Sequence, residues 1–225
     1  MDLCGHATLA TAAVLLQKCG NKNSLLHFAT KSGELIAATL PGTSAIEIEL
    51  PLNPPLPVES FSPSIQTLIE LVLGENNEHV VKDIMYSQRT KKLVFELDSA
   101  IVDRNFLESL VVSPSALLAV DQSDRGTESS ITGVIVTMLD ESKEYDFISR
   151  YFAPWNGIDE DPVTGSAHTV ISPMWTEKLN GQTQFTARQC SPRGGDLGLE
   201  VDLNGGRLFV SGNACVVIEG SIRIE

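Results

Sequence analysis

Residues 157–168 read GIDEDPVTGSAH, and this stretch decides the fold because it leads into a helix that we expect to run to about residue 178. Gly165 and Ser166 mark the helix start, where backbone N–H groups without intrahelical acceptors form a site for an anion such as a carboxylate. Acids in front of a helix are also ordinary residues that favour the helix dipole, and this alternative applies to all three acids of the stretch. Asp161 has the strongest claim to function, because the proline after it fixes the direction of the chain.

A second helix start lies near the beginning of the chain, where residues 4–8 read CGHAT. The alanine and leucine content that follows predicts a helix over residues 5–18, and its lack of a clear polar face predicts a sheet wrapped around it. Cys4 at a helix N-terminus can have a lowered thiol pKa, and His6 beside it can exchange protons near neutral pH. The alternative for either residue alone is a small buried thiol, or a histidine that satisfies a helix end.

The order of the predicted elements indicates an internal repeat. Strands are predicted after the first helix at residues 25–30, 34–40 and 45–50, and after the second at residues 184–190, 196–203, 207–211 and 216–222. The turn SGEL at residues 32–35 also matches GGDL at residues 194–197. Two homologous halves would bring both helix starts to one cleft, with a proton-transfer group on each side of a ligand, as an isomerase needs. Chance similarity is the alternative, because small residues at helix starts and Gly–acid turns are common.

The segment PLNPPLP at residues 51–57 interrupts every regular pattern and predicts a domain boundary. We predict a first domain over residues 1–56, with the C-terminal strand as its candidate completion, and a second domain over residues 57–225. The remaining elements fall in the second domain, with helices expected at residues 64–73 and 103–110 and strands at residues 80–87, 92–97, 131–139 and 145–152.

Composition excludes several classes of function. The net charge of −13 argues against nucleic acid or an anionic membrane as a partner. The four cysteines have no zinc-finger spacing, and so few in a chain of 225 residues are typical of reduced thiols in a cytoplasmic protein. No glycine-rich nucleotide motif occurs, so no nucleotide cofactor is implied. The first apolar run is too short to span a membrane and has no basic segment before it.

Several segments together resemble the PhzF-like (phenazine biosynthesis-like) family. They are DLCGHATLATAAVLL from residue 2, RYFAP from residue 150 with GIDEDPVTGSAH, and CSPRGGDLGLEVD with LFVSGNACVVIEG near the end. The resemblance covers nearly the whole chain, and GIDEDPVTGSAH is its most specific part. It implies an α+β fold of the diaminopimelate-epimerase-like type, in which two similar domains each wrap a mixed sheet around a central helix and the site lies between them.

The resemblance also implies a function, namely a cofactor-independent and metal-free isomerase that moves a proton on a small carboxylate-bearing substrate. Its site residues carry over to this chain as catalytic His6, Asp161 and Cys4 and substrate-binding Gly5, Gly165 and Ser166. Cys4 is included because a thiol stands at the comparable position in related epimerases.

One family feature has no counterpart in this chain. The family's principal acid–base glutamate lies upstream of the CGHAT motif, and no residue here takes that position. We therefore expect the first domain to be incomplete, with apolar surface and unpaired strand edges at which a homodimer or aggregates form. The alternative function, from a different class, is a binding or interaction protein that has kept the fold without the chemistry.

Overall fold

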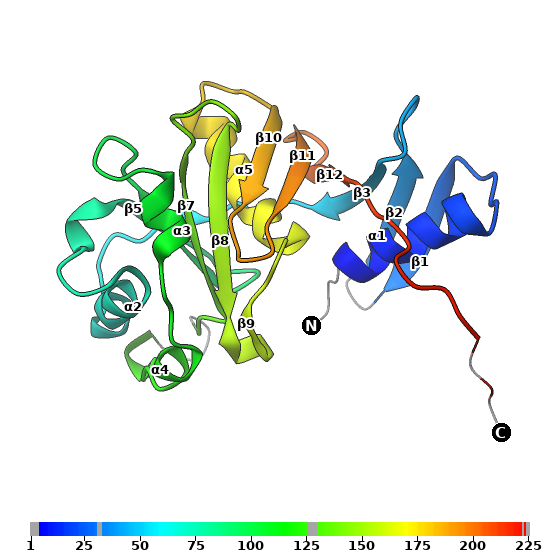
Figure 1. The fold of residues 1–225 in the computed structure, drawn as a ribbon. Coiled ribbons are helices and arrows are strands. Elements are labelled where there is room, and N and C mark those ends of the chain that lie inside the picture. Colours follow the sequence, from blue (N-terminus) through cyan, green and yellow to red (C-terminus); the bar gives the residue numbers. More distant parts are fainter. Residues whose placement is uncertain (1–4, 31–32, 126–129, 222, 224–225) are drawn as a thin grey trace.

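The computed structural model describes residues 5–30, 33–125, 130–221 and 223. Within them, strands form one mixed sheet in the order β1-β2-β3-β12-β11-β10-β8-β7-β6-β5-β4, with β9 paired to β8 (Figure 1). The strands are β1 Leu25–Thr30, β2 Gly33–Thr39, β3 Ile46–Pro51, β4 Leu56–Pro57, β5 Val81–Ser87, β6 Lys92–Leu97, β7 Gly133–Leu139, β8 Phe147–Ala153, β9 Ile158–Glu160, β10 Gln184–Gln189, β11 Gly195–Asp202 and β12 Arg207–Gly212. The pairs β6–β7 and β8–β10 are parallel, and the other pairs are antiparallel.

Five α-helices accompany this sheet in the described residues. They are α1 Gly5–Ala13, α2 Pro63–Leu73, α3 Arg104–Ser109, α4 Pro114–Leu118 and α5 Gly165–Lys178, and a π-helical turn, Val14–Lys18, extends α1. Three 3-10 turns add Glu78–Val80, Ser123–Arg125 and Pro154–Asn156. The sequence predicted neither α4 nor β9, because both are too short to show a periodic pattern of apolar residues. None of the helices described is both long and apolar enough to cross a membrane.

The strand predicted over residues 216–222 is wrong, because the described residues from 213 to 221 form no strand. Val217 and Ile218 are 82% and 87% exposed, so their apolar side chains gain nothing from a neighbouring sheet. This segment leaves β12 and runs beside α1, where Lys18 and Glu219 lie 3.3 Å apart (Figure 1). A β-branched run is therefore not sufficient for a strand where it does not pair with a neighbouring strand.

The element order that the sequence repeat predicted occurs twice. The strands β1–β2–β3 form an antiparallel meander after α1, and β10–β11–β12 form another after α5. Gly33 and Gly194, in the matching turns, have φ of 98° and 66°, a backbone conformation that favours glycine. The two meanders join through β3 and β12, where Ile48 lies opposite Val210. A symmetry between the halves and the residue ranges of two domains stay predictions.

The two long helices differ in how they are covered. Helix α5 is surrounded by the larger part of the sheet, and its residues 167–176 are all buried (Figure 1). The ring of Trp175 stacks on Phe147 and its Nε1 donates a hydrogen bond of 3.1 Å to Thr137 Oγ1. Helix α1 buries only Thr8, Ala12 and Ala13, and the next residue, Val14, is 42% exposed. The described part of the sheet therefore covers α1 less completely than it covers α5.

Apolar side chains form two cores on opposite faces of the sheet. One core lies between the sheet and the two long helices, and it includes Ala12, Ile48 and Val170. The other lies under α2, α3 and α4, and it includes Leu68 and Phe95. Strands β6 and β8 are consequently buried on both faces, which explains their nearly continuous apolar character.

Leu50 connects the first meander to the second helix. Its side chain is fully buried, and its Cδ1 would lie 3.1 Å from a Cβ placed on Gly165. We predict that Leu50→Ala lowers the free energy of unfolding by about 2–5 kcal/mol, because the cavity would lie at this junction. Urea unfolding followed by circular dichroism would measure the change, with Leu56→Ala as the control because Leu56 is 68% exposed. Equal stability losses in the two variants would contradict the prediction.

Candidate functional site

The N-termini of α1 and α5 meet at the junction of the two meanders. A Cβ placed on Gly5 would lie 3.9 Å from the Cα of Gly165 and 3.3 Å from Ile48 Cδ1. A side chain at Gly5 would crowd Ile48, and one at Gly165 would crowd Leu50, so both glycines leave room for side chains of β3. The structure brings together the two motifs that the sequence singled out.

The turn before α5 is fixed by Gln189 at the end of β10. Gln189 Oε1 accepts a hydrogen bond of 2.7 Å from the N–H of Thr164, and its Nε2 donates to the carbonyl of Asp161. The same Nε2 lies 3.2 Å from Thr164 Oγ1, and Ser191 Oγ donates to the carbonyl of Pro162 at 2.9 Å. Sequence reasoning missed Gln189, because a glutamine at the end of a strand shows no signal until the fold places it against this turn.

The start of α5 has donors available to an anion. Thr164 occupies the N-cap, but its side chain makes no capping hydrogen bond to the helix. The N–H groups of Gly165 and Ser166 at the first two helical positions have no acceptor within the helix. A carboxylate or phosphate group would satisfy them and would be favoured by the helix dipole.

The three acids of the GIDEDPVTGSAH stretch lie in three different environments. Asp159 is exposed to solvent. Glu160 accepts hydrogen bonds of 2.7 and 2.8 Å from the Nε and Nη2 of Arg150, so its charge is neutralised. Asp161 is buried, with 7% of its surface exposed, and its backbone N–H donates to the carbonyl of Tyr151 at 3.0 Å. Of the three acids, only Asp161 brings a buried charge close to the start of α5.

Two further buried polar residues stand near Asp161. Lys92, at the beginning of β6, is 7% exposed, and its Nζ lies 5.7 Å from the centre of the Tyr151 ring. Burial lowers the pKa of Lys92 to about 8, although the charge of Asp161 opposes this shift. Burial also raises the pKa of Tyr151, and the charge of Asp161 adds to it. A lysine at the start of a strand that is buried on both faces was the available sequence signal for this cluster.

Gly133 makes room for this arrangement. A Cβ on Gly133 would lie 2.4 Å from the phenol oxygen of Tyr151, so the ring crosses β7 only because residue 133 has no side chain. Gly133 is paired with Lys92 across the parallel ladder of β6 and β7. The phenol is thereby directed over the strand that carries the lysine.

The predicted site residues fall into three groups. Gly5 and Gly165 are in contact distance, Ser166 is half-buried at the same helix start, and Asp161 is buried beside it. His6 follows Gly5 and is exposed. Cys4 lies outside the described residues. The catalytic and binding roles of these residues stay predictions.

His168, one turn into α5, is a buried part of the helix. Its Nδ1 lies 2.7 Å from the carbonyl oxygen of Thr164, and its Nε2 has no hydrogen-bond partner among the described residues. Burial lowers its pKa to about 4, although the bond to Thr164 opposes this shift, so the ring is neutral near pH 7.

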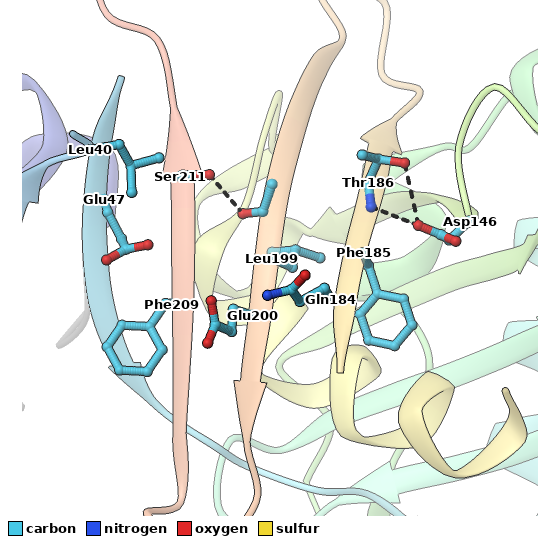
Figure 2. A pocket seen from close by; sticks show the side chains of 11 residues that line it. Leu40, Glu47, Asp146, Gln184, Phe185, Thr186, Leu199, Glu200, Phe209 and Ser211 are labelled. Carbon is cyan, nitrogen blue, oxygen red and sulfur yellow. Dashed lines mark hydrogen bonds between the residues drawn. The ribbon is translucent and has the colours of Figure 1, made fainter. Parts of the chain in front are cut away.

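A separate hollow lies on the outer face of β3, β12, β11 and β10 (Figure 2). Glu47 and Glu200 stand on its floor beside Phe209, and Asp146 Oδ2 accepts a hydrogen bond of 2.7 Å from the N–H of Thr186 at its edge. Burial raises the pKa of Glu47, with further contributions from the charges of Glu200 and Glu49. None of the predicted site residues lines this hollow. In the described part of the chain, no group of three or more His, Cys, Asp or Glu side chains is arranged to hold a metal ion.

Comparison with known proteins gives one consistent family. A family model described as "Phenazine biosynthesis-like protein" matches residues 1–220. A human phenazine biosynthesis-like domain-containing protein is 43% identical over 226 residues, which cover 99% of this chain and 73% of that protein. A Pseudomonas aeruginosa protein named an uncharacterized isomerase is 36% identical over 224 residues, which cover 100% of this chain and 74% of that protein.

A solved structure confirms the predicted type of fold. The crystal structure of a PhzF-family phenazine biosynthesis protein from Enterococcus faecalis superposes with a TM-score of 0.80 at 33% identity. The match covers 100% of this chain and 74% of that one.

The burial of His168 predicts a loss of stability in acid. Its pKa is about 4 in the folded chain and near 6.5 when unfolded, so the unfolded chain gains a proton first as the pH falls. The stabilising contribution is complete above about pH 6.5 and should be lost toward pH 4, by about 3 kcal/mol. Unfolding free energies measured across this range should decline less steeply in His168→Asn, whereas His79→Gln, at an exposed site, should behave as the unaltered chain does. An unchanged slope in His168→Asn would contradict this assignment.

Proposed function

Because the chain belongs to the phenazine biosynthesis-like protein family, we propose that it is an isomerase that moves a proton within a small carboxylate-bearing substrate. The observation that carries the proposal is the meeting of the two helix starts, at which Gly5 and Gly165 are in contact distance. The name of the Pseudomonas aeruginosa relative, an isomerase, supports the same reaction class. The site would be the junction of α1 and α5.

Each helix start contributes a different part of the proposed reaction. The N–H groups of Gly165 and Ser166 bind the substrate carboxylate, and the Ser166 hydroxyl donates a further hydrogen bond to it. Asp161 approaches the substrate from the α5 side. His6, and Cys4 beside it, approach from the α1 side, where Gly5 offers a backbone amide. An acid–base group on each side of a bound ligand is the arrangement that a proton shift requires.

The proposed chemistry balances without a co-reactant. The Asp161 carboxylate takes a proton from a carbon atom of the substrate, and the electron pair moves into the conjugated carboxylate. A protonated His6 then delivers a proton to another carbon atom, and proton exchange with water returns both side chains to their starting states. Substrate and product have the same atoms and the same oxidation state, so the proposal requires no metal and no organic cofactor.

We predict that the protein incorporates deuterium from heavy water into members of a panel of small unsaturated and aromatic carboxylates. Asp161→Asn should lower the exchange rate by roughly 10²–10⁴-fold, because the amide cannot accept the proton. His6→Gln should also lower it. Proton NMR of each incubated compound would measure the loss of the exchanging signal, and His79→Gln provides a control outside the site.

The same panel separates the proposed isomerase from the alternative function. Calorimetry with benzoate as the probe measures carboxylate binding without any chemistry. Binding without deuterium exchange in any compound would favour a binding or interaction protein. An absence of benzoate binding would contradict the carboxylate site itself.

A further inference from the structure

The two charged residues on the α5 side of β6 have different surroundings. Lys92, Val94 and Glu96 alternate with residues of the opposite core, and Val94 belongs to the core around α5. Glu96, 2% exposed at its side chain, is paired with Lys178 at 2.6 Å and with Lys82 at 3.5 Å. Among the described residues, Lys92 has no carboxylate within ion-pair distance and no hydrogen-bond partner. A buried ammonium without a direct partner lowers stability, so its presence at this place requires an explanation.

The surroundings of Lys92 connect it to the site. Its ammonium lies over the ring of Tyr151, whose backbone carbonyl accepts the N–H of Asp161 at 3.0 Å. Lys92 and Asp161 are both 7% exposed, and neither side chain forms an ion pair among the described residues. Asp161 is the charged residue that acts on the Lys92 ammonium. In a buried environment such charges act on each other beyond the range of a direct ion pair.

We propose that Lys92 is a positioning residue that acts through Tyr151 and Asp161: its ammonium offsets the charge of the Asp161 carboxylate, so that an anionic substrate can bind at the helix starts. This inference rests on the proposed binding of a carboxylate at the junction of α1 and α5. Of the three acids at residues 159–161, Glu160 is paired with Arg150 and Asp159 is exposed to solvent. Asp161 is the third, and we propose that Lys92 offsets its charge.

Several titratable groups surround Lys92 or the helix starts, and comparison with Lys92→Met separates their effect from that of the ammonium. On α5, the pKa of His168 is about 4, so this residue is neutral above pH 6. On β8, the pKa of Tyr151 is raised, which keeps the phenol protonated. Further along β6, Glu96 is held by its two lysines, and on α1 His6 is exposed. The pKa of Lys92 itself is about 8, so its charge is lost between pH 7 and pH 9.5.

The first experiment measures benzoate binding by calorimetry at pH 7 and pH 9.5 in a double-mutant cycle. Lys92→Met, which removes the charge and keeps an unbranched side chain of nearly the same length, should weaken binding at pH 7 by about tenfold, and Asp161→Asn should strengthen it. The double variant should bind nearly as Asp161→Asn does, because the ammonium then has no carboxylate to offset. The unaltered chain should bind more weakly at pH 9.5, and Lys92→Met should show no such change. Lys82→Met, at the ion-paired lysine, is the matched control and should bind normally.

A second measurement follows Lys92 in the ligand-free protein. NMR of lysine labelled with ¹³C at the ε position reports its titration, and the signal is assigned by its absence in Lys92→Met. The midpoint should lie near pH 8 and should fall by about half a pH unit or more in Asp161→Asn, because the favourable charge is removed. Thermal unfolding would establish that each variant is folded.

These outcomes separate the inference from the function on which it rests. Equal benzoate binding by the unaltered chain and Lys92→Met would overturn the inference, as would additive effects of the two substitutions. An unchanged Lys92 midpoint in Asp161→Asn would also overturn it. If the protein binds no benzoate, the proposed carboxylate site falls, while the NMR midpoints still decide whether the two charges are coupled.

Discussion

The pairing of β3 with β12 is the constraint on which the rest of the structure depends. This ladder runs from Ile46 opposite Gly212 to Pro51 opposite Arg207, and it joins the meander after α1 to the meander after α5. Because β3 also carries Ile48 and Leu50 against the two helix starts, the ladder sets the distance between them. Without this pairing, the first three strands would have no contact with the larger part of the sheet, and the two motifs would not meet.

The acids next to the start of α5 are arranged so that few negative charges face it. A stretch with three consecutive acids would repel an anion if all three pointed toward the helix start. Instead, Arg150 binds Glu160 in a bidentate pair and also donates to the carbonyls of Leu107 and Leu110 on the other face of the sheet. The alternation of side chains along the chain thus directs neighbouring acids to opposite sides. The buried carboxylate near the start of α5 is therefore that of Asp161, and the buried ammonium of Lys92 acts on it.

Much of the fold could be predicted from the sequence, because the patterns that predicted it are local. The alternation in β3, the apolar run of β6 and the glycine-led helix of α5 each depend on residues close together in the chain. Family resemblance added the type of fold and the candidate residues Asp161 and Gly165. Local pattern failed at residues 216–222, because strand formation there depends on pairing with a neighbouring strand.

Gln189 and Lys92, which support the candidate site, could not be predicted from the sequence, because their contacts also depend on the fold. Gln189 acts on the turn before α5 only because β10 returns beside it, and Lys92 meets the ring of Tyr151 where that ring passes Gly133. These relations join segments that lie far apart in the chain. A single sequence gives the residues but not the distances between them. The two helix starts could therefore be predicted, whereas the contacts of Gln189 and Lys92 could not.

The β3–β12 ladder also has a consequence for synthesis of the protein. Residue 48 must remain without its partner until residue 210 has left the ribosome, and at about 5–20 residues per second this wait is roughly ten seconds or longer. During that time the backbone groups of β3 that later pair with β12 stay exposed to other nascent chains. The junction of α1 and α5 is therefore completed late in synthesis, when β12 pairs with β3.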